Sequence, residues 1–138
     1  MSERENTTLV MGLYDAYRRG DIATIMQSLD PDVVFEAEGP AVLPYSGIHH
    51  GLEGAAKYFG GIRDSMDEVV LDIRPFAAEG DNVAMSGRYR ARVISTGQHI
   101  DVPIVHLFTI RKGKVVRYQN LSDTGAVVAA FTAGAARA

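Results

Sequence analysis

The sequence HIDVPIVHLFTI occupies residues 99–110, and its length and alternation predict a long β-strand. Strands in globular proteins usually have about five or six residues, so this one is unusually long. Long antiparallel strands twist and coil, which predicts a strongly curved sheet. One face of the strand is almost wholly apolar and carries Ile100, Val102, Ile104, His106, Phe108 and Ile110.

The other face of the same strand is also largely apolar. It carries Asp101, Pro103, Val105, Leu107 and Thr109. An antiparallel sheet with one solvated face shows a cleaner alternation of apolar and polar residues than this. The chain has no spare helix to cover a second apolar face, so we expect a homodimer formed through the sheet.

Further strands are predicted on both sides of residues 99–110. The segments 69–79, 83–95 and 115–121 are rich in β-branched residues and are separated by short Gly-containing turns, which favours antiparallel pairing. An earlier strand is predicted at 33–37, followed by a loop at 39–50 that contains two prolines and two glycines.

Helices are predicted before and between these strands. Ser2 and Glu5 have the spacing of a capping box, and apolar residues then recur every three or four positions up to Gly20. Shorter helices are predicted at 22–29, at 52–66, where Gly60-Gly61 favours a break, and after Asp123. Helices and strands are segregated along the chain, so we expect an α+β fold.

Composition narrows the class of protein. The chain of 138 residues suits a single domain spanning 1–138, with a mobile tail at 132–138. Its net charge is −3, and it has no cysteine and no apolar run long enough to cross a membrane. We therefore expect a cytoplasmic protein without nucleic-acid or membrane partners, and we expect neither a metal site nor a cofactor.

A pocket follows from the predicted curvature. Helices laid over the concave side of a strongly coiled sheet cannot fill it completely, which leaves an apolar, cone-shaped cavity. Cavities of this kind bind small molecules. We expect the ligand to be small, apolar or cyclic.

Several local motifs resemble one known superfamily. YDAYRRGD at residues 14–21, DPDVVF at 30–35, SGIHHG at 46–51 and HLFTIRKGKVV at 106–116 are similar to motifs of the nuclear transport factor two-like superfamily, in its SnoaL-like, ketosteroid-isomerase-related branch. The resemblance implies a cone-shaped α+β barrel with helices over the concave face of a mixed or antiparallel sheet, and dimers packed sheet to sheet. That branch includes isomerases, polyketide cyclases, dehydratases and epoxide hydrolases.

The catalytic residues of two known activities in that branch do not match this chain. The ketosteroid isomerase base, oxyanion-binding Asp and Tyr fall on Ala37, Val105 and Leu13. One Asp of the epoxide hydrolase set falls on Asn120, and no carboxylate is found near 88–91, where the rest of the set would lie. Neither classical steroid isomerisation nor epoxide hydrolysis is expected.

The alignment of Val105 with a ketosteroid isomerase site residue suggests which strand faces line the cavity. If Val105 faces the cavity, then Asp101 shares its face by the two-residue period, and Asn120 faces inward from the last strand. A register slip of one residue would instead place His106 in the cavity. The candidate catalytic residues are Asp101, Asn120, His49 and His106. The candidate pocket residues are Leu13, Tyr17, Phe35, Ala37, Phe59, Val105, Tyr118 and Asn120.

Each polar candidate also has a structural interpretation. Asp101 is then a rim residue, Asn120 a structural hydrogen bonder, His49 a surface group, and His106 a buried histidine with a satisfied partner. The function we expect is binding of a small molecule, with acid–base catalysis of the isomerase, cyclase, dehydratase or hydrolase type. The alternatives are a non-catalytic ligand-binding protein and a dimeric association protein.

Overall fold

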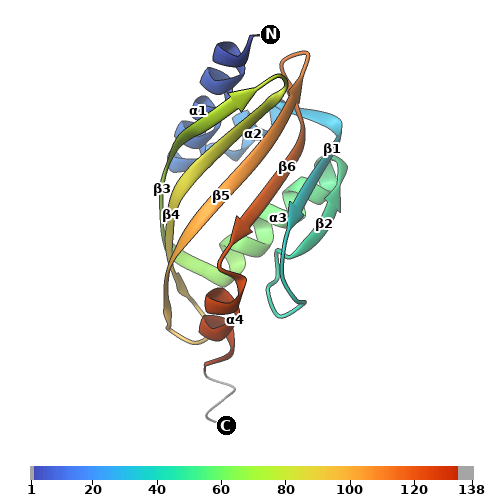
Figure 1. Cartoon of the computed structure of the whole chain (residues 1–138). Coiled ribbons are helices and arrows are strands. Elements are labelled where there is room, and N and C mark those ends of the chain that lie inside the picture. Colours follow the sequence, from blue (N-terminus) through green and yellow to red (C-terminus); the bar gives the residue numbers. More distant parts are fainter. Residues whose placement is uncertain (1, 134–138) are drawn as a thin grey trace.

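Six strands form one curved, unclosed sheet in the order β2-β1-β6-β5-β4-β3, as seen in the computed structural model, which describes residues 2–133 (Figure 1). The strands are β1 (Leu29–Ala37), β2 (Gly47–His50), β3 (Met66–Glu79), β4 (Asn82–Val93), β5 (His99–Arg111) and β6 (Lys114–Ser122). β1 pairs parallel with β6, and every other pairing in this sheet is antiparallel. The predicted mobile tail lies outside the described residues apart from 132 and 133.

Helices α1, α2 and α3 cover one face of the sheet, whereas α4 continues from the end of β6 (Figure 1). They are α1 (Glu3–Arg18), α2 (Ile22–Gln27), α3 (Gly51–Ser65) and α4 (Thr124–Thr132). The predicted capping box is present, since Glu5 N donates to Ser2 Oγ and Ser2 N donates to Glu5 Oε1. Asp123 caps α4 by accepting from Ala126 N. The predicted α+β class is confirmed.

Two local predictions were wrong. Residues 47–50, predicted as loop, form the short edge strand β2, which pairs with β1. Helix α3 also continues through Gly60-Gly61 without a break. A Cβ on Gly61 would lie 2.8 Å from the Pro44 carbonyl oxygen, so the glycine allows the loop before β2 to pack directly on the helix.

The length of strands β3, β4 and β5, and the register irregularity next to them, produce the curvature. β3, β4 and β5 have 14, 12 and 13 residues, about twice the usual length. The β5–β6 register shifts between Thr109 and Ile110, which places Val115 and Tyr118 in the core while Val116 lies on the other face. Bulges of this kind increase local twist and bend the strand.

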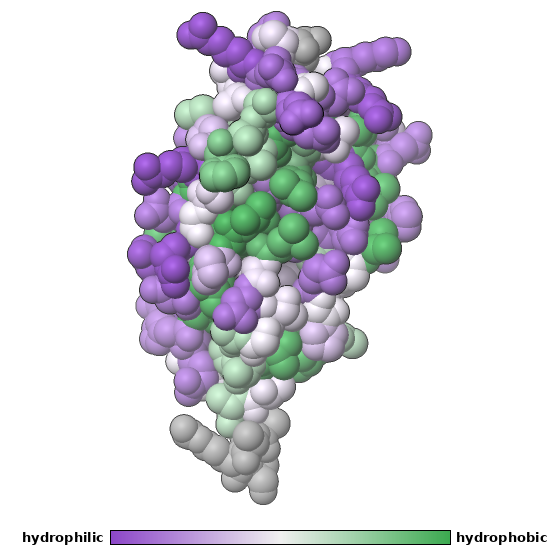
Figure 2. All heavy atoms as spheres, viewed as in Figure 1, coloured by the Kyte–Doolittle hydropathy of each residue, from purple (hydrophilic) through white to green (hydrophobic). Residues whose placement is uncertain are grey.

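The face of the sheet that the helices leave uncovered is partly apolar. Figure 2 shows a hydrophobic patch over the central strands, with hydrophilic residues on both sides. Val105 is 37% exposed on this face, and Leu107 and Leu121 are half-buried beside it. Among the described residues, no helix combines the length and apolar composition needed to cross a membrane.

Candidate functional site

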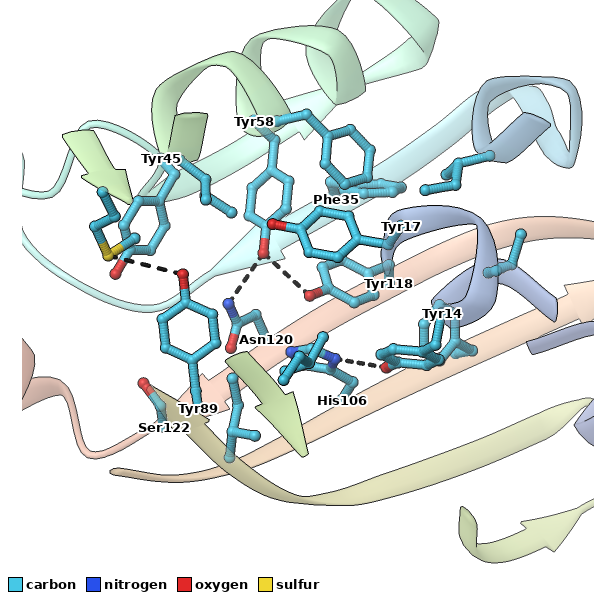
Figure 3. A pocket seen from close by; sticks show the side chains of 18 of the residues that line it. Tyr14, Tyr17, Phe35, Tyr45, Tyr58, Tyr89, His106, Tyr118, Asn120 and Ser122 are labelled. Atoms are coloured by element: carbon cyan, nitrogen blue, oxygen red, sulfur yellow. Dashed lines mark hydrogen bonds between the residues drawn. The ribbon is translucent and has the colours of Figure 1, made fainter. Parts of the chain in front are cut away.

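A cavity lies between the concave face of the sheet and the helices (Figure 3). All six tyrosines of the chain line it, and among the described residues its lining includes no Lys, Arg, Asp or Glu. Apart from the phenols, the polar lining residues are His106, Asn120 and Ser122. The tyrosines are Tyr14, Tyr17, Tyr45, Tyr58, Tyr89 and Tyr118. The site is therefore aromatic, polar at a few positions, and uncharged.

The cavity has the size of a small organic molecule. Its volume is about 80 Å³. A single buried water needs at least roughly 10–15 Å³, so the cavity has room for more than ordered water.

His106 projects from β5 into this cavity and is fixed by Tyr14 of α1. The Tyr14 hydroxyl lies 2.6 Å from His106 Nδ1, and the two rings stack with centroids 5.8 Å apart. The imidazole is 5% exposed, and burial lowers the pKa of His106 to about 3, so the ring is neutral at physiological pH.

The proton of this neutral imidazole can be assigned to one nitrogen. A phenol is a stronger hydrogen-bond donor than neutral imidazole, so we assign the Tyr14 O–H as donor to Nδ1. Nε2 then carries the ring proton. Nε2 is buried and has no hydrogen-bond partner among the described residues.

Asn120 of β6 belongs to a second hydrogen-bonded group. Its Nδ2 donates to the Tyr58 hydroxyl at 3.0 Å, and this hydroxyl lies 3.0 Å from that of Tyr118. Burial raises the pKa of Tyr58 and of Tyr118, which keeps both phenols neutral. Asn120 Oδ1 is buried and lacks a partner among the described residues.

These two groups are neighbours across the sheet. His106 and Asn120 are direct register partners between β5 and β6. Side chains of directly opposed residues have Cβ atoms about 4.5–5.5 Å apart, and both of these side chains face the cavity (Figure 3). The buried donor Nε2–H and the buried acceptor Oδ1 therefore belong to directly opposed residues on adjacent strands, and each lacks a protein partner among the described residues. Unpaired buried polar atoms are uncommon and costly in folded proteins.

Six of the predicted pocket residues line this cavity: Leu13, Tyr17, Phe35, Phe59, Tyr118 and Asn120. Ala37 is buried in the core but does not line the cavity. Of the four candidate catalytic residues, His106 and Asn120 are brought together there, whereas Asp101 and His49 are not.

The predicted inward orientation of Val105 and Asp101 was wrong. Both lie on the uncovered face, where Asp101 pairs with Arg88 at 2.8 Å and Arg90 at 3.5 Å, and the Arg88 hydrogen bond helps to lower the pKa of Asp101. The even-numbered face of β5 is the more apolar one, so burying it against the helices is favoured and His106 turns inward with it.

His49 has a structural position at the edge of the aromatic cluster. Its Nε2 lies 2.9 Å from the Tyr45 carbonyl oxygen. Its ring packs edge-on against the Tyr58 ring, with the two ring centroids 5.9 Å apart. A Cβ on Gly54 would lie 2.8 Å from the His49 backbone, so α3 packs closely at this point. The imidazole thus fastens the loop before β2 to the fold and does not line the cavity.

The sequence pattern did not single out Tyr45, Tyr58 or Tyr89 as site residues. Tyr45 and Tyr89 close the cavity on one side, where Tyr89 donates to Met66 Sδ at 3.7 Å and burial raises the pKa of Tyr45 to about 12 (Figure 3). The available signal was compositional, since six tyrosines and no tryptophan occur in this short chain. Their convergence on one cavity depends on the fold.

Comparison with known proteins identifies the family. The model of the SnoaL-like domain matches residues 10–118, so the chain belongs to the SnoaL-like domain family. No curated protein matches. An NTF2-like protein from Burkholderia xenovorans is similar in structure, with 27% identity, a TM-score of 0.85, and coverage of 95% of this chain and 98% of that one.

Two further solved structures share the fold at lower identity. TerC, co-crystallised with polyporic acid, has 24% identity and a TM-score of 0.80, covering 91% of this chain and 97% of its own. A candidate polyketide cyclase from Xanthomonas campestris has 22% identity and a TM-score of 0.72, covering 94% of this chain and 99% of its own. At this level of identity the likeness shows the fold alone.

Proposed function

We propose that this protein binds a cyclic, largely apolar small molecule in the tyrosine-lined cavity. The observation that carries the proposal is the pair of buried polar atoms without protein partners, His106 Nε2 and Asn120 Oδ1, in an otherwise apolar wall. Such a wall supplies affinity through burial of apolar area, and a few polar groups supply orientation. The co-crystallisation of TerC with polyporic acid is consistent with a cyclic ligand in a cavity of this fold.

Bicyclic indanes test the binding proposal because they are small, rigid, cyclic and largely apolar. A ligand that binds only the folded state stabilises it by RT ln(1 + L/Kd), where L is the free ligand concentration, so the melting temperature rises once the ligand concentration exceeds Kd. We expect stabilisation by 5-indanol and saturation-transfer NMR signals from its ring protons. Absence of both signals across a panel of one- and two-ring compounds would contradict the proposal.

Two neighbouring residues on β5 provide a matched pair of variants. Ile104 lines the cavity, whereas Val105 lies on the uncovered face. Ile104→Phe is expected to fill part of the cavity and weaken indane binding, and Val105→Phe is expected to leave it unchanged. Equal effects of the two substitutions would place the ligand elsewhere.

A catalytic role is a second candidate, favoured by the neutral imidazole that Tyr14 holds in place. A fixed N–H donor in a water-poor site stabilises negative charge developing on a carbonyl oxygen, and neutral imidazoles act in this way. The chemistry would be proton transfer next to a carbonyl, as in an isomerase or cyclase. The described lining contains no carboxylate base, Nε2 of His106 carries the ring proton and Nδ1 is engaged by Tyr14, so a water molecule would have to take up the proton.

Deuterium exchange tests catalysis separately from binding. We expect the protein to accelerate exchange of the ring CH₂ protons of 2-indanone in D₂O, followed by proton NMR. His106→Asn keeps an amide group near the Nδ1 position and removes Nε2, so it should abolish the acceleration. Exchange at the uncatalysed rate with bound 2-indanone would support binding without catalysis.

We also propose that the uncovered face of the sheet packs against a second copy of this chain. The patch around Val105, Leu107 and Leu121 is apolar and continuous over the central strands (Figure 2). Large exposed apolar patches on soluble proteins commonly mark interfaces, and a two-fold dimer would place the same patch on both partners.

A further inference from the structure

We propose that the ligand group bound between His106 and Asn120 is a hydroxyl, so that the molecules this cavity takes are phenols or the enol forms of cyclic ketones. This inference rests on the proposed binding function and specifies its ligand class. It is argued from the two unpartnered atoms, from the hydrogen bonds that fix their neighbours, and from the absence of charge in the described lining.

The two unpartnered atoms have opposite hydrogen-bonding roles. The Tyr14 hydroxyl donates to Nδ1 of His106, so the ring presents Nε2–H as a donor. The Asn120 amide nitrogen is engaged with Tyr58, so the amide presents Oδ1 as an acceptor. The cavity therefore offers one donor and one acceptor from adjacent strands.

A ligand hydroxyl pairs with both atoms. A hydroxyl accepts from Nε2–H through its oxygen and donates its own proton to Oδ1. A carbonyl or ether oxygen accepts from Nε2–H but leaves Oδ1 unpaired. A carboxylate does the same and also buries a charge without a countercharge. A site built to bind a hydroxyl discriminates strongly against analogues that lack it, because the buried partner atoms then remain unpaired.

The cavity favours an uncharged ligand. The described lining has no cationic side chain, and the His106 imidazole is neutral. A phenolate or enolate would thus enter the cavity without a countercharge and opposite the Asn120 carbonyl oxygen. The hydroxyl form of the ligand is the one that fits.

Three indanes of matched shape separate this inference from the proposed function: 5-indanol, 5-methoxyindane and 5-methylindane. Titration calorimetry, or ligand-observed NMR for weak binding, gives Kd for each. We expect 5-indanol to bind on the order of tenfold or more tightly than the other two, since it gains two hydrogen bonds with buried partners. Equal affinities for the three would overturn the hydroxyl inference and leave the binding proposal intact. Absence of binding by all three would overturn both.

Variants at the two residues give a second readout. His106→Asn removes Nε2, so we expect this variant to lose the preference for 5-indanol over 5-methoxyindane. His106→Gln places an amide near the Nε2 position, so we expect it to keep part of this preference. Asp101→Asn, on the uncovered face, should keep the full preference. If His106→Asn is folded by circular dichroism and keeps the full preference, the inference is wrong. If it does not fold, the ratio of affinities in the unaltered protein decides alone.

Discussion

The Tyr14 hydroxyl lies 2.6 Å from Nδ1 of His106, although 92 residues separate the two in the chain. This contact joins helix α1 to strand β5 beneath the curved sheet. It orients the imidazole so that Nε2 faces the cavity beside Asn120, its register partner on β6. We therefore expect both stability at low pH and ligand recognition to depend on His106.

Acid pH should destabilise the protein through His106. Its pKa is about 3 when folded and about 6.5 when exposed, so between these values the unfolded chain binds the extra proton. The stability contributed by the neutral ring is complete above pH 6.5 and is lost as pH falls toward 3. We expect a loss of about 2 kcal/mol between pH 7 and pH 5 from this residue. Urea unfolding across this range measures it.

The matched comparison for this prediction is between two histidines. His106→Asn should show a shallower decrease in unfolding free energy between pH 7 and pH 5 than the unaltered protein. His50→Asn, at an exposed position, should retain the full decrease. An unchanged slope in His106→Asn would contradict the assigned pKa shift.

The Tyr58 hydroxyl should matter more for stability than the Tyr118 hydroxyl. Tyr58 accepts from Asn120 Nδ2 and bonds Tyr118, so Tyr58→Phe leaves two buried groups unpaired. Tyr118→Phe removes one bond and leaves Tyr58 still paired with Asn120. We expect losses of about 2–3 kcal/mol and about 1 kcal/mol, measured by chemical unfolding. The reverse order would mean that Tyr58 is not the centre of this group.

Gly87 should tolerate no side chain, because β3 approaches it closely. A Cβ at this position would lie 2.8 Å from Ile73 Cα and would clash with the Asp72 carbonyl oxygen. Gly87→Ala should cost about 2 kcal/mol or more. Gly12→Ala, in open space on α1, should instead stabilise by about 0.5–1 kcal/mol. Thermal unfolding of both variants checks the prediction, and a neutral Gly87→Ala would refute the close approach.

Ligand ionisation should control the pH dependence of binding. Between pH 5.5 and 8.5 the His106 imidazole and the Tyr58 and Tyr118 phenols stay neutral, because their pKa values lie outside this range. The affinity for 4-nitrophenol, which ionises near neutral pH, should therefore decrease as pH rises, while that for 5-indanol stays constant. Calorimetry at several pH values measures both. Tighter binding of 4-nitrophenol at higher pH would show that the cavity accepts the phenolate.

The dimer proposal predicts a change of mass on one substitution. Leu107→Glu places a charge in the apolar patch and should convert the dimer to a monomer, as measured by light scattering after size exclusion. Lys112→Glu, in the β5–β6 turn, is the control and should leave the mass unchanged. A monomeric unaltered protein at micromolar concentration would contradict the proposal.

Much of the fold was determined by the sequence itself. The capping box at Ser2, the caps at Asp21 and Asp123, and the alternation along residues 99–110 are local signals, so the helix starts and the long strands were predictable without the structure. The α+β class and the SnoaL-like resemblance follow from the order of these elements and from short motifs. Caps, turns and apolar periodicity are readable in this way because each depends on residues that are close together in the sequence.

The site was decided by tertiary structure. Both faces of residues 99–110 contain apolar residues. The even-numbered face is the more apolar, but only the packed structure shows that this face, with His106, lies against the helices. A shift of one position would exchange the faces. The bulge after Thr109 and the convergence of six tyrosines from helices, strands and a loop likewise have no local signal. Pairings between residues 60 to 92 positions apart, such as Tyr58 with Tyr118 and Tyr14 with His106, arise only when the sheet curves around the cavity.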